Sequence, residues 1–507
     1  MRITSPIHAA DRAAGRFRSA LIDPAKRERT VLVSLAIYAV LWAIYGTIAK
    51  GSQGLHYDMT EVIAWSRDLS LGYLKHPPLA AWIVWLWFGV FPVAEWSYYG
   101  LAMLMPAIAL WFAWRLSADY LDIEKRVVGL ALLTLIPFFN FHALKYNVNT
   151  VLIPVWAATT FWFLRSYQRR SRIYAALAGV AAAACMLGKY WSVFLLAGLF
   201  VAALIDVRRT AYFRSAAPWL TVLAGLAMLA PHLVWLNQHD FAPFGYAMGI
   251  HGEKPFAATV KGVLGYFGGS IGYVAIPLIA VLLAARPSRR TIADMMWPAA
   301  GERRLAAAAF WAPFLLPVIG ALASGTEITS LWSMPAWTLL PVLLLSSPAV
   351  NVAAADTRRI LMAAVAVPLV MLIAAPIIAI MAQRAGPPAT AQAHLLAVEV
   401  ERLWHETTVQ PLRYVDGDAG IVFDVVTYAG ARPRSLPGLP RASEAQLTRA
   451  GMALVCFAED TGCRSAAALR AAAVAGSRTV ESVIVRNYLT LPGKPRRYTI
   501  VIVPPRP

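Results

Sequence analysis

The sequence predicts an α-helical membrane protein with many spans and a small α/β domain at its C-terminus. Apolar residues make up 59% of the 507 residues and charged residues only 14%, whereas soluble domains have roughly 45–50% and about 25%. Long apolar runs recur from residue 31 to residue 383, and polar residues return from about residue 390. So few charges cannot cover a soluble surface, and disorder requires low hydrophobicity with high charge.

Twelve apolar runs are candidates for membrane helices. The first, Val31 to Ala49, carries no charge and is long enough to cross a bilayer. It follows a basic segment, residues 1–30, which we expect in the cytoplasm. The other runs cover residues 79–94, 98–118, 126–140, 150–166, 174–188, 191–206, 215–235, 259–285, 304–323, 334–348 and 360–383.

Basic clusters between the runs predict which loops face the cytoplasm. They lie at residues 165–172, 208–209, 286–290, 303–304 and 358–359, and cytoplasmic loops carry such an excess of Lys and Arg. The same rule accounts for the net charge of +19, and no nucleic-acid-binding motif points to nucleic acid. The pattern places the first loop, residues 50–78, and everything after residue 384 on the outer side. It requires an odd number of crossings, so we expect about 11 spans, with the run 79–94 interfacial or re-entrant.

Residues 386–507 are predicted to form a periplasmic α/β domain. Alternating runs at 420–428, 453–457 and 498–503 indicate strands, and residues 390–406 and 464–473 have the pattern of helices. Cys456 and Cys463 in this domain could form a disulfide in an oxidising compartment, although their spacing leaves free thiols equally open. Residues 31–385 are expected to form the membrane module.

The first outer loop carries the most informative polar residues. Asp58 and Glu61 are three residues apart, so on a helix they share a face. A carboxylate there could be a solvated residue, a helix cap, a ligand of a divalent cation or a general base. Lys75 and His76 precede Pro77–Pro78, a rigid turn that would direct both donors towards an anionic group. The alternative is that these side chains reach the membrane interface before the next apolar run.

Further polar residues gather at the predicted outer ends of the helices. Lys189, followed by Tyr190, lies between two apolar runs with no carboxylate nearby in sequence, and an ionisable residue so placed suggests a functional site. Its alternative role is that of an interface lysine. We expect substrate contacts from Lys145, Asn147, Asn149, His232, His239 and Asp240.

These groups suit an enzyme that acts on a lipid phosphate. A carboxylate can take a proton from an attacking hydroxyl, cationic side chains can stabilise a departing phosphate, and apolar grooves can hold a polyprenyl tail. Hydrolase, zincin and nucleotide-binding motifs are not apparent. A transporter or lipid flippase is the main alternative, but the paired repeats common in transporters are not found.

The order of motifs resembles the GT-C membrane glycosyltransferases. A single N-terminal span precedes YDMTE and LGYLKHPPLAAW, and LKYNVNTVLIPVW at 144–156, LGKYWSVFLL at 187–196 and APHLVWLNQHDF at 230–241 follow. The chain is similar over about residues 30–340 to the bacterial group of protein O-mannosyltransferases, lipid A aminoarabinose transferase and rhizobial galacturonosyltransferases.

The resemblance implies a GT-C-like catalytic module that transfers a sugar, usually with inversion, from a polyprenyl-phosphate donor on the outer face of a bacterial inner membrane. The acceptor could be lipid A, another glycan, a hopanoid or a protein. Asp58 matches the first-loop aspartate, the base or acceptor-positioning carboxylate, while His76 and Lys189 match residues that approach the donor phosphate.

The sequence departs from these relatives at two places. Asn147 and Asn149 lie where the aminoarabinose transferase has a second aspartate, and an amide cannot act as a base. Lys75 occupies a position where relatives can carry Glu, so a metal held by that Glu is not carried over, although Asp58 with Glu61 could still bind one. No other cofactor is expected, because the donor already contains an activated glycosyl phosphate.

Overall fold

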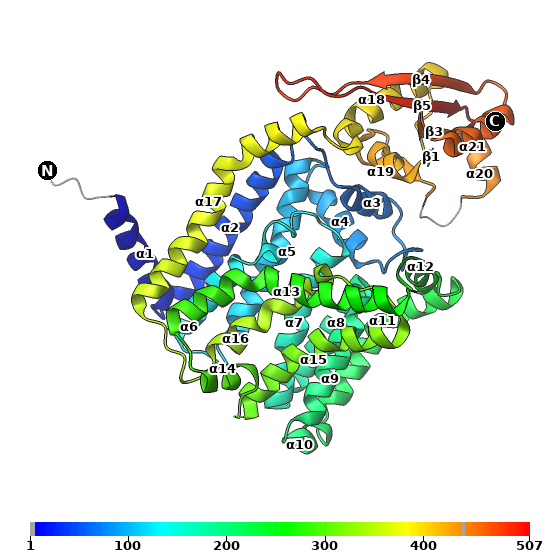
Figure 1. Cartoon of the computed structure of the whole chain (residues 1–507). Helices are drawn as coiled ribbons and strands as arrows, with labels where there is room; N and C mark the ends of the chain where they lie inside the picture. The colour runs from blue at the N-terminus through cyan, green and yellow to red at the C-terminus, as the bar shows by residue number, and fades with distance from the viewer. Residues whose placement is uncertain (1–5, 253, 300, 438–441, 507) are drawn as a thin grey trace. The chain divides into compact units, whose positions relative to one another are not determined.

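The computed structural model describes residues 6–252, 254–299, 301–437 and 442–506 (Figure 1). The chain forms two compact units. The first contains Met1–Ala43, Ala102–Leu144 and Val148–Leu372, and the second contains Ile44–Leu101, Lys145–Asn147 and Ile373–Pro507. The second unit therefore joins the first loop to the C-terminal residues, whereas we predicted a division of the chain at residue 386.

The described residues of the first unit form helices joined by loops, without a strand. Three long helices, α2 (Arg27–Ala49), α5 (Glu95–Ser117) and α17 (Ala354–Ala385), continue from one unit into the other. The other helices of the first unit are α1 (Pro6–Ile22), α6 (Ile123–Thr134), η1 (Pro137–Phe139), α7 (Val148–Arg169), α8 (Arg172–Gly188), η2 (Tyr190–Ser192), α9 (Val193–Ile205), α10 (Arg209–Phe213), α11 (Ala217–Gln238), α12 (Ala242–His251), α13 (Phe256–Ala285), α14 (Arg289–Met296), α15 (Gly301–Ser324), η3 (Ser330–Leu339) and α16 (Leu340–Leu345).

Six of the described helices, α2, α5, α11, α13, α15 and α17, are long and apolar enough to cross a membrane. Four more of the predicted runs form shorter apolar helices, at Leu79–Val90, Arg172–Gly188, Tyr190–Ile205 and Ser330–Leu345. The two remaining runs, 126–140 and 150–166, correspond to α6 and α7. The total number of crossings stays a prediction. Helix α4 (Leu79–Val90) has 12 residues and extends about 18 Å, which is shorter than a core of ~30 Å. Helix α6 has the same length, so the identity of the non-crossing run also stays a prediction.

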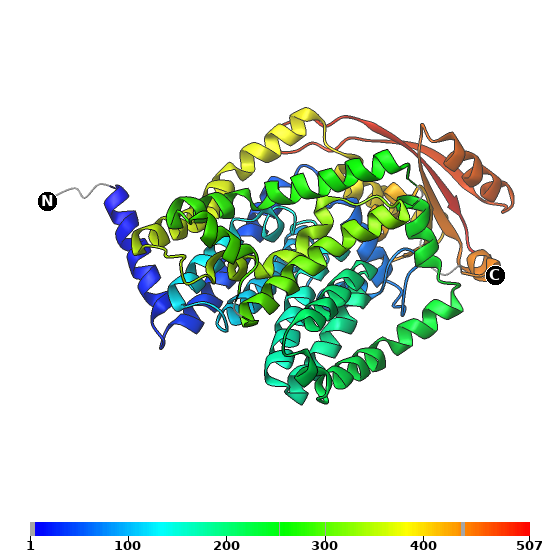
Figure 2. The ribbon, with the colours of Figure 1, turned by 60° about the horizontal axis from the view of Figure 1, so that its bottom comes forward.

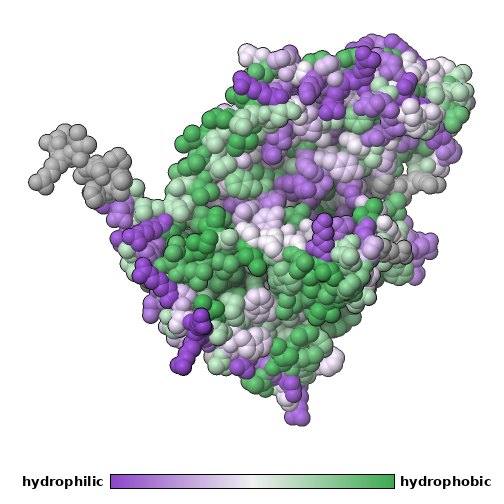
Figure 3. Space-filling model, in the orientation of Figure 1, coloured by the Kyte–Doolittle hydropathy of each residue, from purple (hydrophilic) through white to green (hydrophobic). Residues whose placement is uncertain are grey.

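The long helices expose apolar side chains. Leu264 and Leu283 of α13 are 67% and 70% exposed, and Ile373 of α17 is 77% exposed. Figure 3 shows largely hydrophobic surfaces over α13 and α17, and a largely hydrophilic surface over the strands. Apolar surface on this scale marks a membrane or an interaction site, and the helix lengths fit a membrane.

Helices α8 and α11 approach each other closely inside the first unit. A Cβ atom on Gly179 of α8 would lie only 2.3 Å from the carbonyl oxygen of Thr221 in α11. Glycine therefore permits backbone contact, and this contact sets the spacing of the helices around a cavity described below.

The second unit contains a five-stranded sheet. Its strands are β1 (Tyr414–Gly417), β2 (Arg434–Ser435), β3 (Met452–Phe457), β4 (Arg478–Ile484) and β5 (Arg496–Val503), in the order β2-β1-β3-β5-β4. Strand β1 pairs in parallel with β2 and β3, whereas β5 pairs antiparallel with β3 and β4. Figures 1 and 2 show β4 and β5 as a long two-stranded ribbon. The predicted strands at 453–457 and 498–503 are confirmed.

Helices cover both faces of this sheet. The helices of the second unit are α3 (Tyr57–Ser66), α4, η4 (Ala389–Gln392), α18 (Ala393–Thr407), α19 (Ala419–Tyr428), α20 (Glu444–Ala450) and α21 (Thr461–Ala472). The side chains of Ala453 and Val455 lie in one core with α18, α19 and Ala64 of α3. Those of Leu454 and Cys456 lie in a second core with α20 and α21. The helices predicted at 390–406 and 464–473 are confirmed as α18 and α21.

The strand predicted at 420–428 is wrong, because these residues form α19. The side chain of Asp418 caps the helix by accepting a hydrogen bond of 2.7 Å from the Gly420 amide. Every residue from Ile421 to Thr427 is buried, so the segment shows no one-sided period. Its β-branched residues favour a strand, but a short apolar run that is buried on all sides can form either a strand or a helix. Packing against the neighbouring elements decides in favour of the helix.

Cys456 and Cys463 form a disulfide bond, and Cys185 is free and buried. We predict that denatured protein without reductant reacts with one maleimide per chain, and that reduced protein reacts with three. Such a bond persists in an oxidising compartment. Counting adducts by mass spectrometry tests it, with Cys185→Ser as the control that should leave no reactive thiol before reduction. Three adducts without reductant would contradict the bond.

Candidate active site

The first loop, residues 50–78, folds so that Asp58 lies in the first turn of α3. His56 is the N-cap residue, and its Nδ1 accepts a hydrogen bond of 3.1 Å from the Asp58 amide. An acidic side chain in a first helical turn interacts favourably with the helix dipole. Local sequence therefore holds the Asp58 backbone in place.

The Asp58 carboxylate contacts two residues that lie far away in the sequence. Its Oδ2 accepts a hydrogen bond of 2.8 Å from the Asn147 side-chain amide and lies 3.2 Å from the Lys145 ammonium. Its Oδ1 is 3.5 Å from Nδ1 of His56. Asn147 is only 6% exposed, whereas about a third of the Asp58 and Lys145 side-chain surfaces stays accessible. The structure thus brings together three of the predicted site residues around one accessible carboxylate.

These neighbours keep Asp58 ionised. Burial by itself raises the pKa of a carboxyl group, but the positive charge of Lys145 and the hydrogen bond from Asn147 outweigh it, and His56 adds a smaller lowering effect when its ring is protonated in acid. The pKa of Asp58 therefore lies below its usual value, and the group is a carboxylate at neutral pH. Burial, together with Lys145 and Lys50, also lowers the pKa of His56 in spite of Asp58, which favours its neutral form.

Glu61 forms a separate ion pair on the same helix. The Lys75 ammonium lies 3.0 Å from both Glu61 oxygens, and the Tyr57 hydroxyl donates a longer bond of 3.4 Å. Only 8% of the Glu61 side chain is exposed, and burial raises its pKa although Lys75 opposes the shift. Lys75, which we expected on the donor phosphate, is thus bound to Glu61.

His76 lies beside Trp65 of α3. The two rings meet edge to face at 5.8 Å between centroids, and the His76 carbonyl accepts a bond of 3.0 Å from the Tyr73 amide. The turn before Pro77 therefore folds back on α3, and the imidazole stays partly exposed.

Lys189 belongs to a second cluster, in the first unit. It ends α8 in an extended conformation, and its ammonium donates a hydrogen bond of 2.8 Å to the Asn149 carbonyl oxygen. The same ammonium lies 4.7 Å from the centre of the Trp332 ring, and His251 meets that ring edge to face. Burial and the charge of Lys189 lower the pKa of His251. In the sequence, Val148 alone separates Asn149 from Asn147.

A stack of rings follows Lys189. The Tyr190 hydroxyl and His232 Nε2 are 3.0 Å apart, and the Tyr190 ring stacks on Phe244. His232 also stacks on Trp235, which stacks on His239. His239 Nδ1 lies 2.9 Å from the Trp235 carbonyl oxygen of its own helix. Asp240 lies exposed in the turn that follows, with a φ of 51°.

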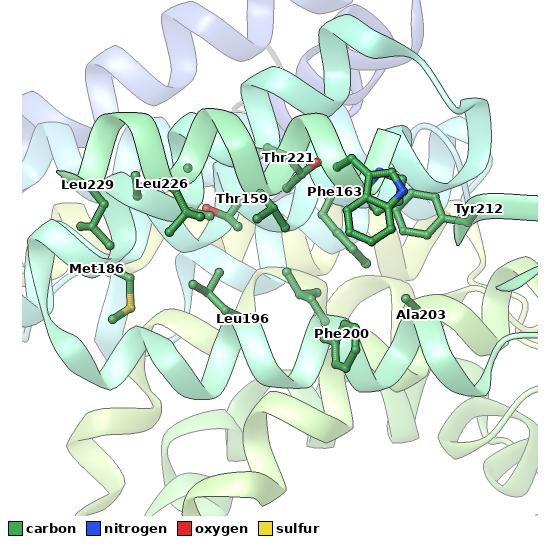
Figure 4. Close-up of a pocket in the computed structure, with 18 of the residues that line it drawn as sticks. Thr159, Phe163, Met186, Leu196, Phe200, Ala203, Tyr212, Thr221, Leu226 and Leu229 are labelled. Carbon is green, nitrogen blue, oxygen red and sulfur yellow. The ribbon is translucent and has the colours of Figure 1, made fainter. Parts of the chain in front are cut away.

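An apolar cavity of about 410 Å³ lies among α7, α8, α9 and α11 of the same unit. Figure 4 shows Leu226 and Leu229 of α11 facing Leu196 and Phe200 of α9 across it. Met186 also lines the cavity, three residues before Lys189.

The described residues offer no group of three or more His, Cys, Asp or Glu side chains that could hold a metal ion. Asp58 and Glu61, the two candidate ligands, are each neutralised by a lysine. This arrangement does not fit a divalent cation, and we assign no step to one.

Sequence reasoning missed several contributors to these clusters. His56 was overlooked because histidine is not a usual N-cap residue. Trp332 lies in η3, far along the chain from Lys189, and no local pattern connects the two. Lys145 and Asn147 were expected to contact substrate, but their partnership with Asp58 could not be read from spacing.

Comparisons with known proteins agree with the resemblance to GT-C glycosyltransferases. Residues 75–235 match the family model for dolichyl-phosphate-mannose-protein mannosyltransferase. Among curated proteins none matches the sequence. The fold is similar to that of ArnT from Cupriavidus metallidurans in the apo state, with a TM-score of 0.62 and 13% identity over 94% of this chain and 98% of ArnT. ArnT bound to undecaprenyl phosphate gives a TM-score of 0.58 and 13% identity, over 92% of this chain and 97% of ArnT.

The similarity covers almost the whole length of both chains, so it includes the C-terminal sheet as well as the membrane helices. At 13% identity, this structural similarity shows the fold alone. The family match covers the segment that contains Lys75, Lys145 and Lys189. The predicted fold class is confirmed: the chain has a GT-C fold like that of ArnT, and its family match indicates a glycosyltransferase.

Proposed function

We propose that this protein transfers a sugar from a polyprenyl-phosphate donor to a hydroxyl or similar acceptor group of the cell envelope. The observation that carries the proposal is the Asp58 carboxylate, which Lys145 and Asn147 hold in its ionised form while part of it stays accessible. An ionised, positioned carboxylate is what general base catalysis requires.

In the proposed reaction, Asp58 accepts the proton of the acceptor group. The acceptor oxygen attacks the anomeric carbon from the side opposite the phosphate, so the new glycosidic bond forms with inversion. The bond between the anomeric carbon and the phosphate oxygen breaks, and polyprenyl phosphate leaves. Lys145 lowers the pKa of Asp58 and so weakens it as a base, but it guarantees that the carboxylate is unprotonated when the acceptor arrives.

We assign Lys189 to the donor phosphate. Its ammonium donates a hydrogen bond to Asn149 and lies over the Trp332 ring. A cationic side chain held in place in this way can stabilise the negative charge that develops on a leaving phosphate. His76 is assigned a supporting contact as a hydrogen-bond donor.

The polyprenyl tail is assigned to the apolar cavity beside α8, α9 and α11. Met186 and Leu229 line this cavity. Lys189 follows Met186 by three residues, and His232 follows Leu229 by three residues. The cavity volume lies within the usual range for ligand pockets, ~300–1,000 Å³. An isoprenoid chain matches this lining in chemistry.

We place the protein in a bacterial inner membrane, with its N-terminus in the cytoplasm and the sheet in the periplasm. The basic clusters support this orientation, and the disulfide in the sheet suits an oxidising compartment. Lipid A, another glycan or a hopanoid is then within reach as an acceptor on the outer face.

Replacing the proposed base should stop turnover without unfolding the protein. We expect Asp58→Asn to lower the rate about 10³-fold, because removal of a general base costs 10²–10⁴-fold. The assay supplies purified protein with a panel of polyprenyl-phosphate sugars and envelope lipids, and mass spectrometry measures free polyprenyl phosphate and the glycosylated product.

Asp68→Asn makes the same chemical change in the same loop, at a residue paired with Arg434, and should keep normal turnover. Normal turnover by folded Asp58→Asn protein would remove Asp58 from the mechanism. Absence of release from any donor by the wild type would count against the transferase and favour a transporter.

The two asparagines allow a sharper test, because the same substitution should act differently at each. Asn147→Asp would place a second carboxyl group at the 2.8 Å contact with Asp58, and two carboxylates so close cannot both ionise. The pKa of Asp58 then rises. Because the base must be ionised, the loss of rate at low pH should shift upward by about 1–3 pH units.

Asn149→Asp should leave this acid limb unchanged. Its carboxylate would pair with Lys189 instead, so we expect a raised KM for the donor. Profiles of kcat/KM against pH for both variants check this. An unshifted acid limb in Asn147→Asp, or an equal shift in both variants, would contradict the assigned partners.

A further inference from the structure

Helix α1 is attached to the first unit along one of its faces. The Arg18 guanidinium binds the Glu124 carboxylate of α6. Seven residues before Arg18, on the same face of the helix, the Asp11 carboxylate lies 2.9 Å from Nε of Arg358 in α17. Leu21, three residues after Arg18, is 3% exposed. These contacts fix the orientation of α1, and therefore the direction in which its opposite face points.

The opposite face of α1 carries exposed cations. Arg12, Arg16 and Ser19 follow one another at positions i, i+4 and i+7, which lie on one side of a helix, and all three are exposed. The ion pairs of Arg18 and Arg358 use the two carboxylates named above, and neither pair includes Arg12 or Arg16. Figure 3 shows hydrophilic residues over α1 next to the hydrophobic surface of the long helices.

An open cleft of about 500 Å³ lies along this basic face. The charged residues of its lining are four cations and one carboxylate, all from the same short segment: Arg12, Arg16, Arg18, Lys26 and Asp23. Asp23 lies 3.7 Å from Lys26, and Arg18 has its own partner in α6. Arg12 and Arg16 therefore leave the cleft with an excess of positive charge, and a concave surface with one sign of charge attracts ions of the opposite sign.

The cleft lies where the chain is expected to enter the membrane. Helix α2 starts at Arg27, directly after the cleft residue Lys26, and is one of the candidate spans. Leu32, Val33 and Ile37 of α2 are 53%, 49% and 54% exposed, as expected of side chains that face lipid. Leu32 is six residues beyond Lys26, a rise of about 9 Å along a helix. The cleft is therefore at the level of the phospholipid headgroups, which border the hydrocarbon core.

We propose that this cleft binds the phosphate group of an anionic phospholipid such as phosphatidylglycerol, and that the bound lipid holds α1 against the membrane surface. A guanidinium can donate two parallel hydrogen bonds to one phosphate, and basic residues on a helix beside a membrane span attract anionic lipids. Inorganic phosphate offers the same oxygens, but the exposed apolar side chains of α2 supply a surface for the acyl chains of a lipid. The inference goes beyond the proposed sugar transfer and requires neither the sugar donor nor Asp58.

Native mass spectrometry of the purified full-length protein tests the roles of Arg12 and Arg16. Each cation near an anionic membrane surface contributes about fivefold to binding. We therefore expect protein with both Arg12→Gln and Arg16→Gln to bind its first phosphatidylglycerol about 25-fold more weakly than the wild type. Both side chains are exposed and glutamine favours a helix, so the variant should fold. Phosphatidylcholine, which has no net charge, should bind equally to both proteins.

A second basic pair provides a matched control. Arg289 and Arg290 begin α14, are exposed, and do not line the cleft. Protein with both Arg289→Gln and Arg290→Gln loses the same charge and should bind its first phosphatidylglycerol as the wild type does. Protein with both Arg12→Lys and Arg16→Lys keeps the charge of the cleft and should retain most of the binding.

Hydrogen exchange of the α1 amides locates the bound lipid. We compare nanodiscs of phosphatidylcholine alone with nanodiscs that also contain phosphatidylglycerol. The anionic lipid should slow exchange in α1 of the wild type, but not in protein with both Arg12→Gln and Arg16→Gln. Inorganic phosphate added to the phosphatidylcholine nanodiscs should give no such protection.

Equal weakening of binding in the two glutamine pairs would overturn the assigned cleft, because it would reflect overall charge. Equal binding of the two lipids by the wild type, or unchanged α1 exchange on addition of phosphatidylglycerol, would also overturn the inference. Protection of α1 by inorganic phosphate would overturn the choice of a phospholipid as the ligand. None of these measurements uses a sugar donor, so absence of sugar transfer would reject the proposed function and leave the lipid result standing.

Discussion

The contact between Asp58 and Lys145 is the interaction on which the proposed chemistry depends. Burial tends to protonate a carboxyl group, and a protonated Asp58 could not accept a proton. Lys145 and Asn147 reverse that tendency from a segment almost ninety residues away. The fold thus brings three consecutive residues of the chain, Lys145–Asn147, into the compact unit of the first loop.

The C-terminal residues take part in the same unit rather than forming a separate appendage. Ala64 of α3 lies in one core with α18, α19 and the sheet, and Arg486 donates to the carbonyl oxygen of Gly51 at the start of the first loop. A loop of this length would be mobile on its own. Packing against a sheet gives it the rigidity that a positioned base requires, which is a physical reason for the sheet to be present.

The sequence predicted those features that depend on local pattern or composition. Apolar runs located the membrane helices because burial in lipid leaves few alternatives, and alternation identified β3 and β5. Helix α19 was mistaken for a strand because a segment buried on all sides loses its period. Asp58 and Lys189 could be named from their motifs, but Asn147 and Trp332 acquire their partners through contacts between distant segments. Such pairings depend on tertiary packing and leave no local signal.

The central claim is that the donor is a lipid phosphate held by Lys189. Native mass spectrometry of the purified protein can compare binding of undecaprenyl phosphate with that of undecaprenol, which has the same tail without the charge. The account predicts strong preference for the phosphate in the wild type and loss of this preference in Lys189→Met, while Lys261→Met, a change at a lysine of α13, keeps it. Equal binding of phosphate and alcohol by the wild type, or an unchanged preference in Lys189→Met, would contradict the account.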